Sequence, residues 1–326
     1  MKGLKEKIIG LADEDLLSIE TALKKNLITY LDLVSDVAGH ILFAGGKRFR
    51  PFLMVLSARI CGYTGEYDKT FSVIFEYLHT ATLLHDDLVD DATIRRGKAA
   101  ANTVYGNAEA VLVGDFLLAR SLSIAVRTGK IEVIEAIGEI TEDMSQGEIH
   151  QLIGKGNLNL TEEEYMDVIR RKTAALIMGA CKCGALIAEA GKEKASILST
   201  YGYNLGMAFQ MTDDLLDYTS DTGTLGKAVG ADLKEGKLTL PVIHSLKNAG
   251  PADRKKMEAV IKNSEFSIDE FDILKGMLEK YGGISYTESL AADHVAKAKE
   301  ALSAFKPTET RDLMMMLADY SVNRES

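Results

Sequence analysis

Apolar residues recur every three to four positions along most of the chain, which is the period of a buried or amphipathic α-helix. Residues 71–84 show the pattern clearly, with apolar side chains at Phe71, Ile74, Phe75, Leu78, Ala81 and Leu84. Most remaining positions there are only weakly polar, and residues 108–126, 174–190 and 196–217 have the same character. A helix that is apolar nearly all round lies in a protein core. The pattern therefore predicts long core helices.

Glycine-rich or polar points separate these helices, at residues 45–46, 62–65, 97–103, 154–159, 220–237 and 282–283. Thr161-Glu162-Glu163-Glu164 has the residue order of a capping box and predicts the start of a helix. No segment keeps the alternation of a half-buried strand for more than a few residues. Only 4 prolines occur in 326 residues, so long stretches lack an obligatory break. We therefore expect an all-α protein.

The chain has no stretch with the composition of an interdomain linker. Its most polar segment, residues 247–270, is expected to be a surface excursion, and helical patterning resumes on both sides of it. We therefore predict a single domain over residues 1–326.

The composition, 46% hydrophobic and 26% charged, is that of a globular protein and excludes a disordered chain. The 38 Lys and Arg residues against 48 Asp and Glu give a formal net charge of −10, which argues against binding to nucleic acid. The first seven residues lack the apolar core of a secretory signal. The longest uncharged run, residues 195–212, contains too many polar side chains for a membrane span.

The cysteines Cys61, Cys181 and Cys183 cannot all pair with one another, and Cys181-Lys182-Cys183 has no second cluster that would complete a zinc site. We expect packed, reduced thiols. Together with the absence of a secretory signal, this predicts a cytoplasmic protein with no membrane span.

Residues 86–90 and 213–217 share the pattern Asp-Asp-x-x-Asp, and each segment ends an apolar helix. The first and last aspartates of each lie one helical turn, about 5.4 Å, apart on the same face. Like charges at this spacing destabilise a helix by about 0.2–0.5 kcal/mol. A single cluster of this kind could be a solvated acidic helix end. Two clusters favour Mg²⁺, which takes one or two carboxylates and completes its shell with water and phosphate oxygens.

Basic residues supply the groups that would hold a phosphate. Residues 45–51 place three cations after a glycine pair, Arg95-Arg96-Gly97-Lys98 follows the first aspartate cluster, and further cations lie at 170–172 and 226–237. Each basic run alone is more often a solvated face, but together they suit a diphosphate. Gly236-Lys237 is followed by Leu238, so there is no Walker-type loop and a nucleotide site is not expected.

These motifs together resemble those of the trans-isoprenyl diphosphate synthases, also called polyprenyl synthetases. Residues 45–51 are similar to the Gly-Gly-Lys-x-x-Arg-Pro segment of that family, and residues 84–90 to its first aspartate motif, with Arg95-Arg96-Gly97 behind it. Residues 210–217 resemble the second aspartate motif, and residues 226–241 resemble the loop that follows. Residues 78–87, 101–103 and 113–116 look most like the octaprenyl-type members.

The resemblance implies an isoprenoid-synthase helical bundle around a central elongation cavity, and a homodimer. It implies that an allylic diphosphate, expected to be farnesyl diphosphate, ionises, that the double bond of isopentenyl diphosphate attacks the carbocation, and that a proton is then removed. Three Mg²⁺ ions are expected in each active site. Metal ions and fixed cations would neutralise the charge on the leaving diphosphate. The product would be lipophilic.

The resemblance also assigns roles to residues at matching motif positions. Mg²⁺ would be bound by Asp86, Asp90, Asp213 and Asp217. The allylic diphosphate would be held by Arg95, Lys172, Thr173, Gln210, Lys227 and Lys237. Isopentenyl diphosphate would be held by Lys47, Arg50, His79 and Arg96. The residues expected to act most directly in catalysis are Asp86, Asp90, Asp213, Lys172 and Lys227.

His79 lies on an apolar helix, where a satisfied core histidine would also be ordinary. Product length is expected to depend on Ala81 and Thr82, just ahead of the first aspartate motif, because short-chain members of the family place an aromatic side chain there as a floor. The small residues here predict an open floor and a product of seven to ten isoprene units, with octaprenyl diphosphate favoured.

Other classes of protein account for fewer of these motifs. A geranylgeranyl or farnesyl diphosphate synthase is the alternative with the same chemistry and an earlier stop. A terpene cyclase or squalene-type synthase would have no use for residues 45–51, and a non-catalytic partner subunit would not need both aspartate clusters. A di-iron bundle needs two Glu-x-x-His motifs, whereas the chain has only Glu76-x-x-His79.

Overall fold

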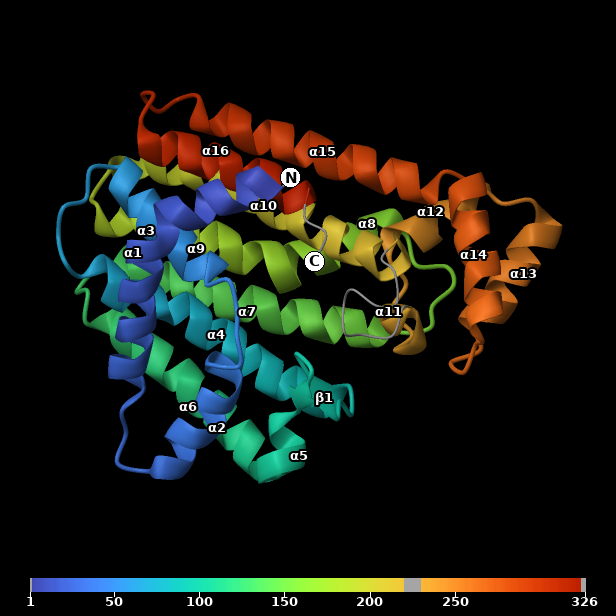
Figure 1. Ribbon diagram of the computed structural model, residues 1–326, viewed down its shortest axis with the longest axis horizontal. Coiled ribbons are helices and arrows are strands. Elements are labelled where there is room, and N and C mark those ends of the chain that lie inside the picture. The colour runs from blue at the N-terminus through green and yellow to red at the C-terminus, as the bar shows by residue number, and fades with distance from the viewer. Residues whose placement is uncertain (1, 220–229, 324–326) are drawn as a thin grey trace. The chain divides into compact units, whose positions relative to one another are not determined.

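The computed structural model describes residues 2–219 and 230–323, and these are almost entirely helical (Figure 1). The prediction of an all-α fold is confirmed. By contact density the chain divides into two compact units, each with its own core. The first unit comprises Met1–Thr141, Leu176–Gly202 and Ala301–Leu317, and the second comprises Glu142–Ala175, Tyr203–Glu300 and Ala318–Ser326. The single-domain description of the chain stays a prediction.

The first unit is built around α4 (Asp68–Val89), which packs against α1 (Lys2–Leu27), α3 (Phe49–Ile60) and α6 (Asn107–Val126). Helix α2 (Asp32–Leu42) lies against α5 (Ala101–Tyr105) and α6. The α4 side chains Phe71, Ile74 and Phe75 are fully buried. The apolar pattern of residues 71–84 therefore correctly predicted a core helix.

A short antiparallel hairpin interrupts the helices after α4. Its strands β1 (Ile94–Arg95) and β2 (Lys98–Ala99) pair Arg95 with Lys98. The turn residues Arg96 and Gly97 both have positive φ, of 53° and 74°, as a two-residue hairpin turn requires. The predicted break at 97–103 is thus partly wrong, because α5 already begins at Ala101.

The second unit contains α8 (Glu162–Ile169), the π-helical turn η1 (Arg170–Ala174), α11 (Ala231–Lys234), α12 (Leu240–Asn248), α13 (Pro251–Ile261) and α14 (Ile268–Lys280). Helices α7 (Ile131–Gly154), α10 (Gly191–Thr219), α15 (Gly283–Leu302) and α16 (Glu309–Val322) contribute residues to both units, and α9 (Ala175–Ile187) begins in the second and continues in the first. The predicted core helices at 108–126, 174–190 and 196–217 correspond to α6, η1 with α9, and α10.

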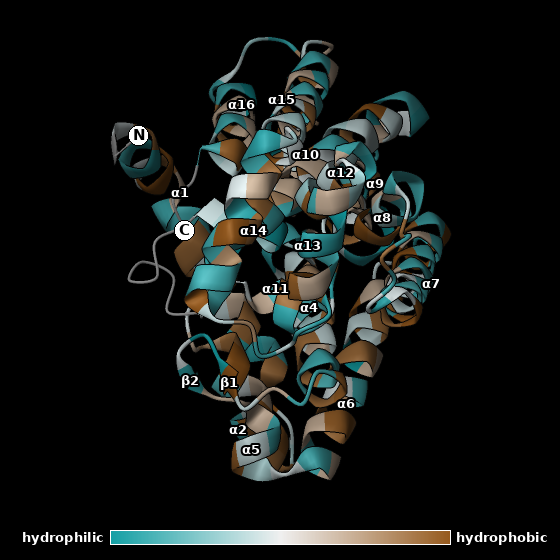
Figure 2. Ribbon diagram, turned by 90° about the vertical axis from the view of Figure 1, so that its right-hand side faces the viewer, coloured by the Kyte–Doolittle hydropathy of each residue, from teal (hydrophilic) through white to brown (hydrophobic). Residues whose placement is uncertain are grey.

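Apolar side chains of α8, α10, α12, α13 and α14 form the core of the second unit. Brown apolar residues beside teal polar ones show the two-sided character of helices such as α14 (Figure 2). The predicted surface excursion at 247–270 is wrong in part. It contains α13, whose Met257, Val260 and Ile261 are buried, because these positions form a stripe of i, i+3, i+4 spacing. Helix α11 likewise lies inside the predicted break at 220–237.

Capping residues set the starts of two helices. Thr161 accepts a hydrogen bond from the Glu164 backbone N–H, and the Glu164 side chain accepts one from the Thr161 N–H, so the predicted capping box is confirmed. Ser267 and Glu270 form a second capping box at the start of α14. None of the helices within 2–219 and 230–323 is long and apolar enough to cross a membrane.

The three cysteines are free thiols, as expected. Burial raises the pKa of Cys181 and of Cys183 to about 12, and that of the half-buried Cys61 to about 11. At pH 8 almost none of the three exists as the nucleophilic thiolate.

We therefore expect none of the three cysteines to react rapidly with a thiol reagent such as 5,5′-dithiobis(2-nitrobenzoate) at pH 8 in the native protein. All three should react once the chain is unfolded in urea. The absorbance of the released thionitrobenzoate measures both counts, and rapid labelling of Cys181 or Cys183 without urea would contradict the described packing.

Candidate functional site

The C-terminal end of α4 carries the first aspartate motif. The backbone N–H of Asp90 donates to the carbonyl oxygen of Asp86 at 2.8 Å, so these two residues lie one helical turn apart on the same face. Both side chains are partly exposed. Asp87, between them, is only 1% exposed. The motif therefore consists of two accessible carboxylates and one buried carboxylate.

Arg95 neutralises the buried carboxylate. Its Nε donates to Asp87 Oδ1 at 2.7 Å, and its Nη2 donates to the same oxygen. Since Arg95 lies on β1, the ion pair fastens the hairpin to the end of α4. The role of Arg95 toward an allylic diphosphate stays a prediction, and the structure places its guanidinium on Asp87.

Arg48 is a buried cation that the sequence did not single out from its neighbours. It is 4% exposed, and its guanidinium donates to Glu20 Oε1 at 2.5 Å, to Glu76 Oε1 at 2.8 Å and to the Leu42 carbonyl oxygen. Its backbone is left-handed, with φ of 47°. Arg48 therefore anchors the loop between α2 and α3.

The glycine pair before Arg48 lies between two guanidinium groups. Arg96 donates to the carbonyl oxygen of Gly45. A Cβ at Gly46 would lie 3.4 Å from Nη1 of Arg48 and 3.4 Å from Nη1 of Arg96, and Gly46 has φ of +150°. The pair thus allows the loop to pass closely between two cations. Lys47, in the same loop, is exposed.

His79 lies within this cluster of cations. Burial and the charges of surrounding arginines hold the pKa of His79 well below its usual range, so the imidazole is neutral at neutral pH. The arginines that act on it are Arg50, Arg96, Arg95 and Arg48. The first unit therefore brings together His79, Arg50 and Arg96, three of the four residues predicted to hold isopentenyl diphosphate.

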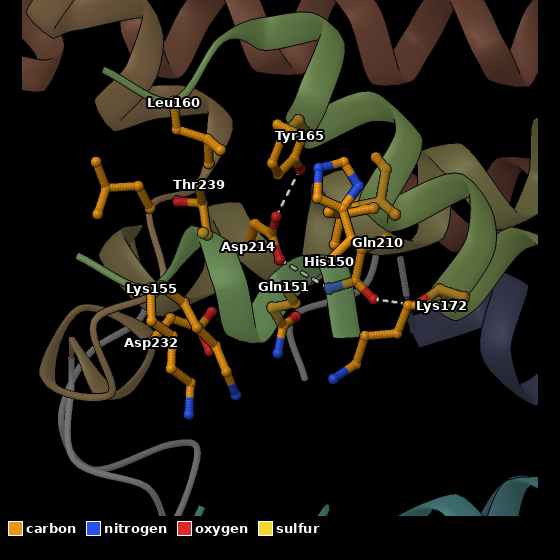
Figure 3. A pocket seen from close by; sticks show the side chains of 16 residues that line it. His150, Gln151, Lys155, Leu160, Tyr165, Lys172, Gln210, Asp214, Asp232 and Thr239 are labelled. Atoms are coloured by element: carbon orange, nitrogen blue, oxygen red, sulfur yellow. Dashed lines mark hydrogen bonds between the residues drawn. The ribbon is translucent and has the colours of Figure 1, made fainter. Parts of the chain in front are cut away.

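A pocket in the second unit brings together residues predicted to hold the allylic diphosphate. Lys172, Thr173, Gln210 and Lys237 all line it. Other lining residues were not predicted, among them His150, Lys155, Tyr165, Asp214 and Asp232. Lys155 and Asp232 lie at one end of the pocket and Lys172 at the other (Figure 3).

A chain of hydrogen bonds crosses this pocket (Figure 3). The Tyr165 hydroxyl donates to Asp214 Oδ2 at 2.5 Å, and Gln210 Nε2 donates to Asp214 Oδ1 at 2.7 Å. The Thr173 hydroxyl donates to Gln210 Oε1 at 2.7 Å. Asp214 is 4% exposed, and burial together with the negative charge of Asp232 raises its pKa well above the usual range.

Lys172 and Lys237, two of the three lysines that line the pocket, each have a carboxylate partner. Lys172 Nζ lies 2.5 Å from Glu148 Oε1, and Lys237 pairs with Glu235. Beside Lys172, Arg170 and Arg171 bind Asp143 and Asp167. Arg170 and Arg171 are thus engaged in ion pairs with two aspartates, and a phosphate role for the whole basic run 170–172 stays a prediction.

The turn η1 positions Lys172 and Thr173. A π-helical turn is wider than an α-helical one and is frequent at functional sites. Gly147 of α7 approaches it so closely that a Cβ there would lie 2.7 Å from the Lys172 backbone nitrogen. On another side, a Cβ at Gly206 of α10 would lie 2.6 Å from the Ala174 Cα. Both glycines are thus required for this approach.

The second aspartate motif ends α10. Asp213 is partly exposed. The carboxylate of Asp217 accepts the backbone N–H groups of Ala231 and Asp232, both at 3.1 Å, and so caps the start of α11. Its proposed metal role stays a prediction. Lys227 lies outside the described residues.

The carboxylates fit a hard, oxygen-ligated cation such as Mg²⁺. The buried Asp87 Oδ2 has no hydrogen-bond partner among the described residues. No group of three His, Cys, Asp or Glu side chains able to hold a metal ion occurs within residues 2–219 and 230–323. Mg²⁺ needs no such cage, since it takes one or two carboxylates and keeps waters and phosphate oxygens.

Two aspartate motifs and clustered cations on an all-α fold define a class of enzymes that act on diphosphates. Comparison with known proteins identifies the class, because the Polyprenyl synthetase family model matches residues 31–276. The chain is 38% identical to octaprenyl diphosphate synthase of Escherichia coli over 98% of its own length and 99% of the relative's. The chain therefore belongs to the polyprenyl synthetase family and is a prenyltransferase.

Solved structures agree with this assignment. A polyprenyl synthase from Caulobacter crescentus, complexed with calcium and isoprenyl diphosphate, superposes with a TM-score of 0.92 at 36% identity, covering 98% of each chain. A decaprenyl diphosphate synthase from Rhodobacter capsulatus gives 0.92 at 35% identity, covering 98% of this chain and 99% of its own. The family is Mg²⁺-dependent. The chain is a trans-prenyl diphosphate synthase.

Substitution of Gly147 tests the close approach to η1. Gly147→Ala should destabilise the protein by about 1–3 kcal/mol, as overpacking does, and should lower prenyl transfer because Lys172 and Thr173 shift. Gly138→Ala on the same helix meets nothing within 4 Å and should stabilise by about 0.5–1 kcal/mol through helix propensity. Urea unfolding and a prenyl-transfer assay measure both, and equal behaviour of the two variants would contradict the packing described.

Proposed function

We propose that this enzyme adds isopentenyl diphosphate units to an allylic diphosphate, with farnesyl diphosphate as primer, and makes octaprenyl diphosphate for a quinone tail. The observation that carries the proposal is the group of arginines around the neutral His79. His79 lies on α4, the helix whose last turn presents Asp86 and Asp90. His79 precedes Asp86 by seven residues, about 10 Å of helix rise, so one helix supplies both an anion site and metal ligands. A homodimer stays our expectation.

Isopentenyl diphosphate would bind in the first unit. Arg50 and Arg96 offer forked guanidinium groups that match phosphate oxygens, and the exposed Lys47 adds a third charge. His79, being neutral, can donate one ring N–H without adding to the repulsion among the arginines. Arg48 would not contact substrate, because its donors are engaged by Glu20, Glu76 and Leu42.

The allylic diphosphate would bind in the pocket of the second unit. Lys172 and Lys237 supply positive charge, and Thr173 and Gln210 supply polar groups that fix orientation. Lys227 is the further cation that the family resemblance implies. The ion pairs of Lys172 with Glu148 and of Lys237 with Glu235 would exchange for contacts with the diphosphate, to which an ammonium group binds strongly.

As the family resemblance implies, Mg²⁺ would be held by Asp86, Asp90, Asp213 and Asp217, and three ions per site stay our prediction. Bound Mg²⁺ neutralises charge on the diphosphate that leaves when the allylic carbon–oxygen bond ionises. Arg50, Arg96 and Lys172 add fixed positive charge that needs no reorganisation during the reaction.

The proposed length of the prenyl product follows from the small side chains and the length of α4. Ala81 is fully buried, and Thr82 donates its hydroxyl proton to the His79 carbonyl oxygen at 2.8 Å, so neither position presents a bulky side chain. With 22 residues, α4 has a length of about 33 Å, enough to line a long product. The similarity to an octaprenyl and a decaprenyl synthase supports a product of seven to ten units over a geranylgeranyl or farnesyl product.

The purified protein, incubated with farnesyl diphosphate, radiolabelled isopentenyl diphosphate and Mg²⁺, should yield a polyprenyl diphosphate. After dephosphorylation, chromatography should show eight isoprene units. Removal of Mg²⁺ with EDTA should abolish synthesis, and added Mg²⁺ should restore it. The proposal fails if no product forms or if synthesis is independent of the metal, and a product of three or four units would assign the short-chain alternative.

Ala81→Tyr tests the position ahead of the first motif. A phenol ring there would block growth of the chain, so products should shorten by several units. Ala81→Ser, which adds one oxygen only, is the matched control and should leave the length unchanged. Circular dichroism melting of both variants establishes that they are folded. Full-length product from a folded Ala81→Tyr enzyme would disprove the open-floor hypothesis.

A further inference from the structure

The buried Asp214 takes no part in the roles assigned so far, although it lines the pocket and follows the proposed ligand Asp213 in the sequence. Both of its oxygens are engaged inside the second unit, Oδ2 by Tyr165 and Oδ1 by Gln210. Asp214 therefore contributes to the pocket by fixing the orientation of neighbouring side chains.

The side-chain amide of Gln210 lies between Asp214 and Thr173. Its Nε2 donates to Asp214 Oδ1, and an amide nitrogen can only donate. The carbonyl oxygen of the same amide then faces Thr173 and accepts the hydroxyl proton. The orientation of Gln210 and that of the Thr173 hydroxyl are thus set together by Asp214.

This orientation matters for an anionic ligand. The Gln210 amide carries two N–H groups, and its bond to Asp214 uses one of them. A flipped amide would place its carbonyl oxygen where the NH₂ group now lies, and a diphosphate oxygen near that oxygen would be repelled. The chain of hydrogen bonds therefore keeps Gln210 able to donate.

Tyr165 stands at one end of this series of hydrogen bonds, and its position is fixed by packing. It is 4% exposed, belongs to the core of the second unit, and follows the capping box that fixes the start of α8. Its hydroxyl is placed 2.5 Å from Asp214 Oδ2.

We propose that Tyr165 is a positioning residue of the prenyl transfer reaction, which acts through Asp214 to hold Gln210 and Thr173 in the orientation that receives the allylic diphosphate. The inference rests on the proposed function of this pocket. It predicts an effect on the allylic diphosphate that is separate from the effect on isopentenyl diphosphate, whose proposed ligands belong to the first unit.

The test is steady-state kinetics of Tyr165→Phe with each substrate varied in turn at saturating Mg²⁺. We expect KM for farnesyl diphosphate to rise about five- to tenfold, the effect of losing one ordinary hydrogen bond, with KM for isopentenyl diphosphate changed by less than about twofold. Asp214→Asn, which keeps the shape and lets the amide flip, should raise the same KM.

Tyr201→Phe is the matched control, because Tyr201 is fully buried, donates its hydroxyl to the backbone oxygen of Met314, and is not among the residues that line the pocket. It removes one buried hydroxyl and should leave both KM values unchanged. Equal KM for farnesyl diphosphate in wild type, Tyr165→Phe and Asp214→Asn would overturn the inference, as would equal increases in both KM values. Absence of synthesis by the wild type would instead overturn the proposed function.

Discussion

The buried guanidinium of Arg48 is the interaction on which the cation-rich part of the first unit depends. A buried charge is tolerated only when it is paired and its hydrogen-bond donors are satisfied. Arg48 meets both conditions through Glu20, Glu76 and the Leu42 carbonyl group. Because Arg48 is bound to these three partners, the loop after the glycine pair is fixed. Arg50 and Arg96 can then remain close to His79.

The two aspartate motifs are built in the same way, with one buried and one accessible aspartate side by side in the sequence. In each, the second aspartate is buried, Asp87 against Arg95 and Asp214 against Tyr165 and Gln210. The first aspartate is partly exposed in each, and it is the one that we propose binds a metal ion. An Asp-Asp pair in these motifs thus combines one carboxylate that is buried in the fold with one that is accessible.

Helices with a strong apolar period could be predicted from the sequence, because burial of one stripe determines them regardless of distant partners. The period of residues 71–84 correctly located α4, and Thr161 with Glu164 located the start of α8. The motif spacing also correctly indicated the family. The ion pairs of Arg170 and Arg171, the burial of Arg48 and the cap that Asp217 gives α11 could not be predicted, because each depends on a partner that only the tertiary fold brings close.

The same limit applied to Tyr165. In the sequence it is an ordinary apolar position of an amphipathic helix, and its hydroxyl gains significance only from Asp214, 49 residues later in the chain.

The π-helical turn at 170–174 lies between two glycines on different helices, Gly147 and Gly206. A side chain at either glycine would collide with the turn, because its Cβ would lie 2.7 Å from the Lys172 backbone nitrogen or 2.6 Å from the Ala174 Cα. Substitutions that aim to change the binding properties of this pocket must therefore leave both glycines in place. Residues that never touch a ligand thus set the limits within which the ligand contacts can be changed.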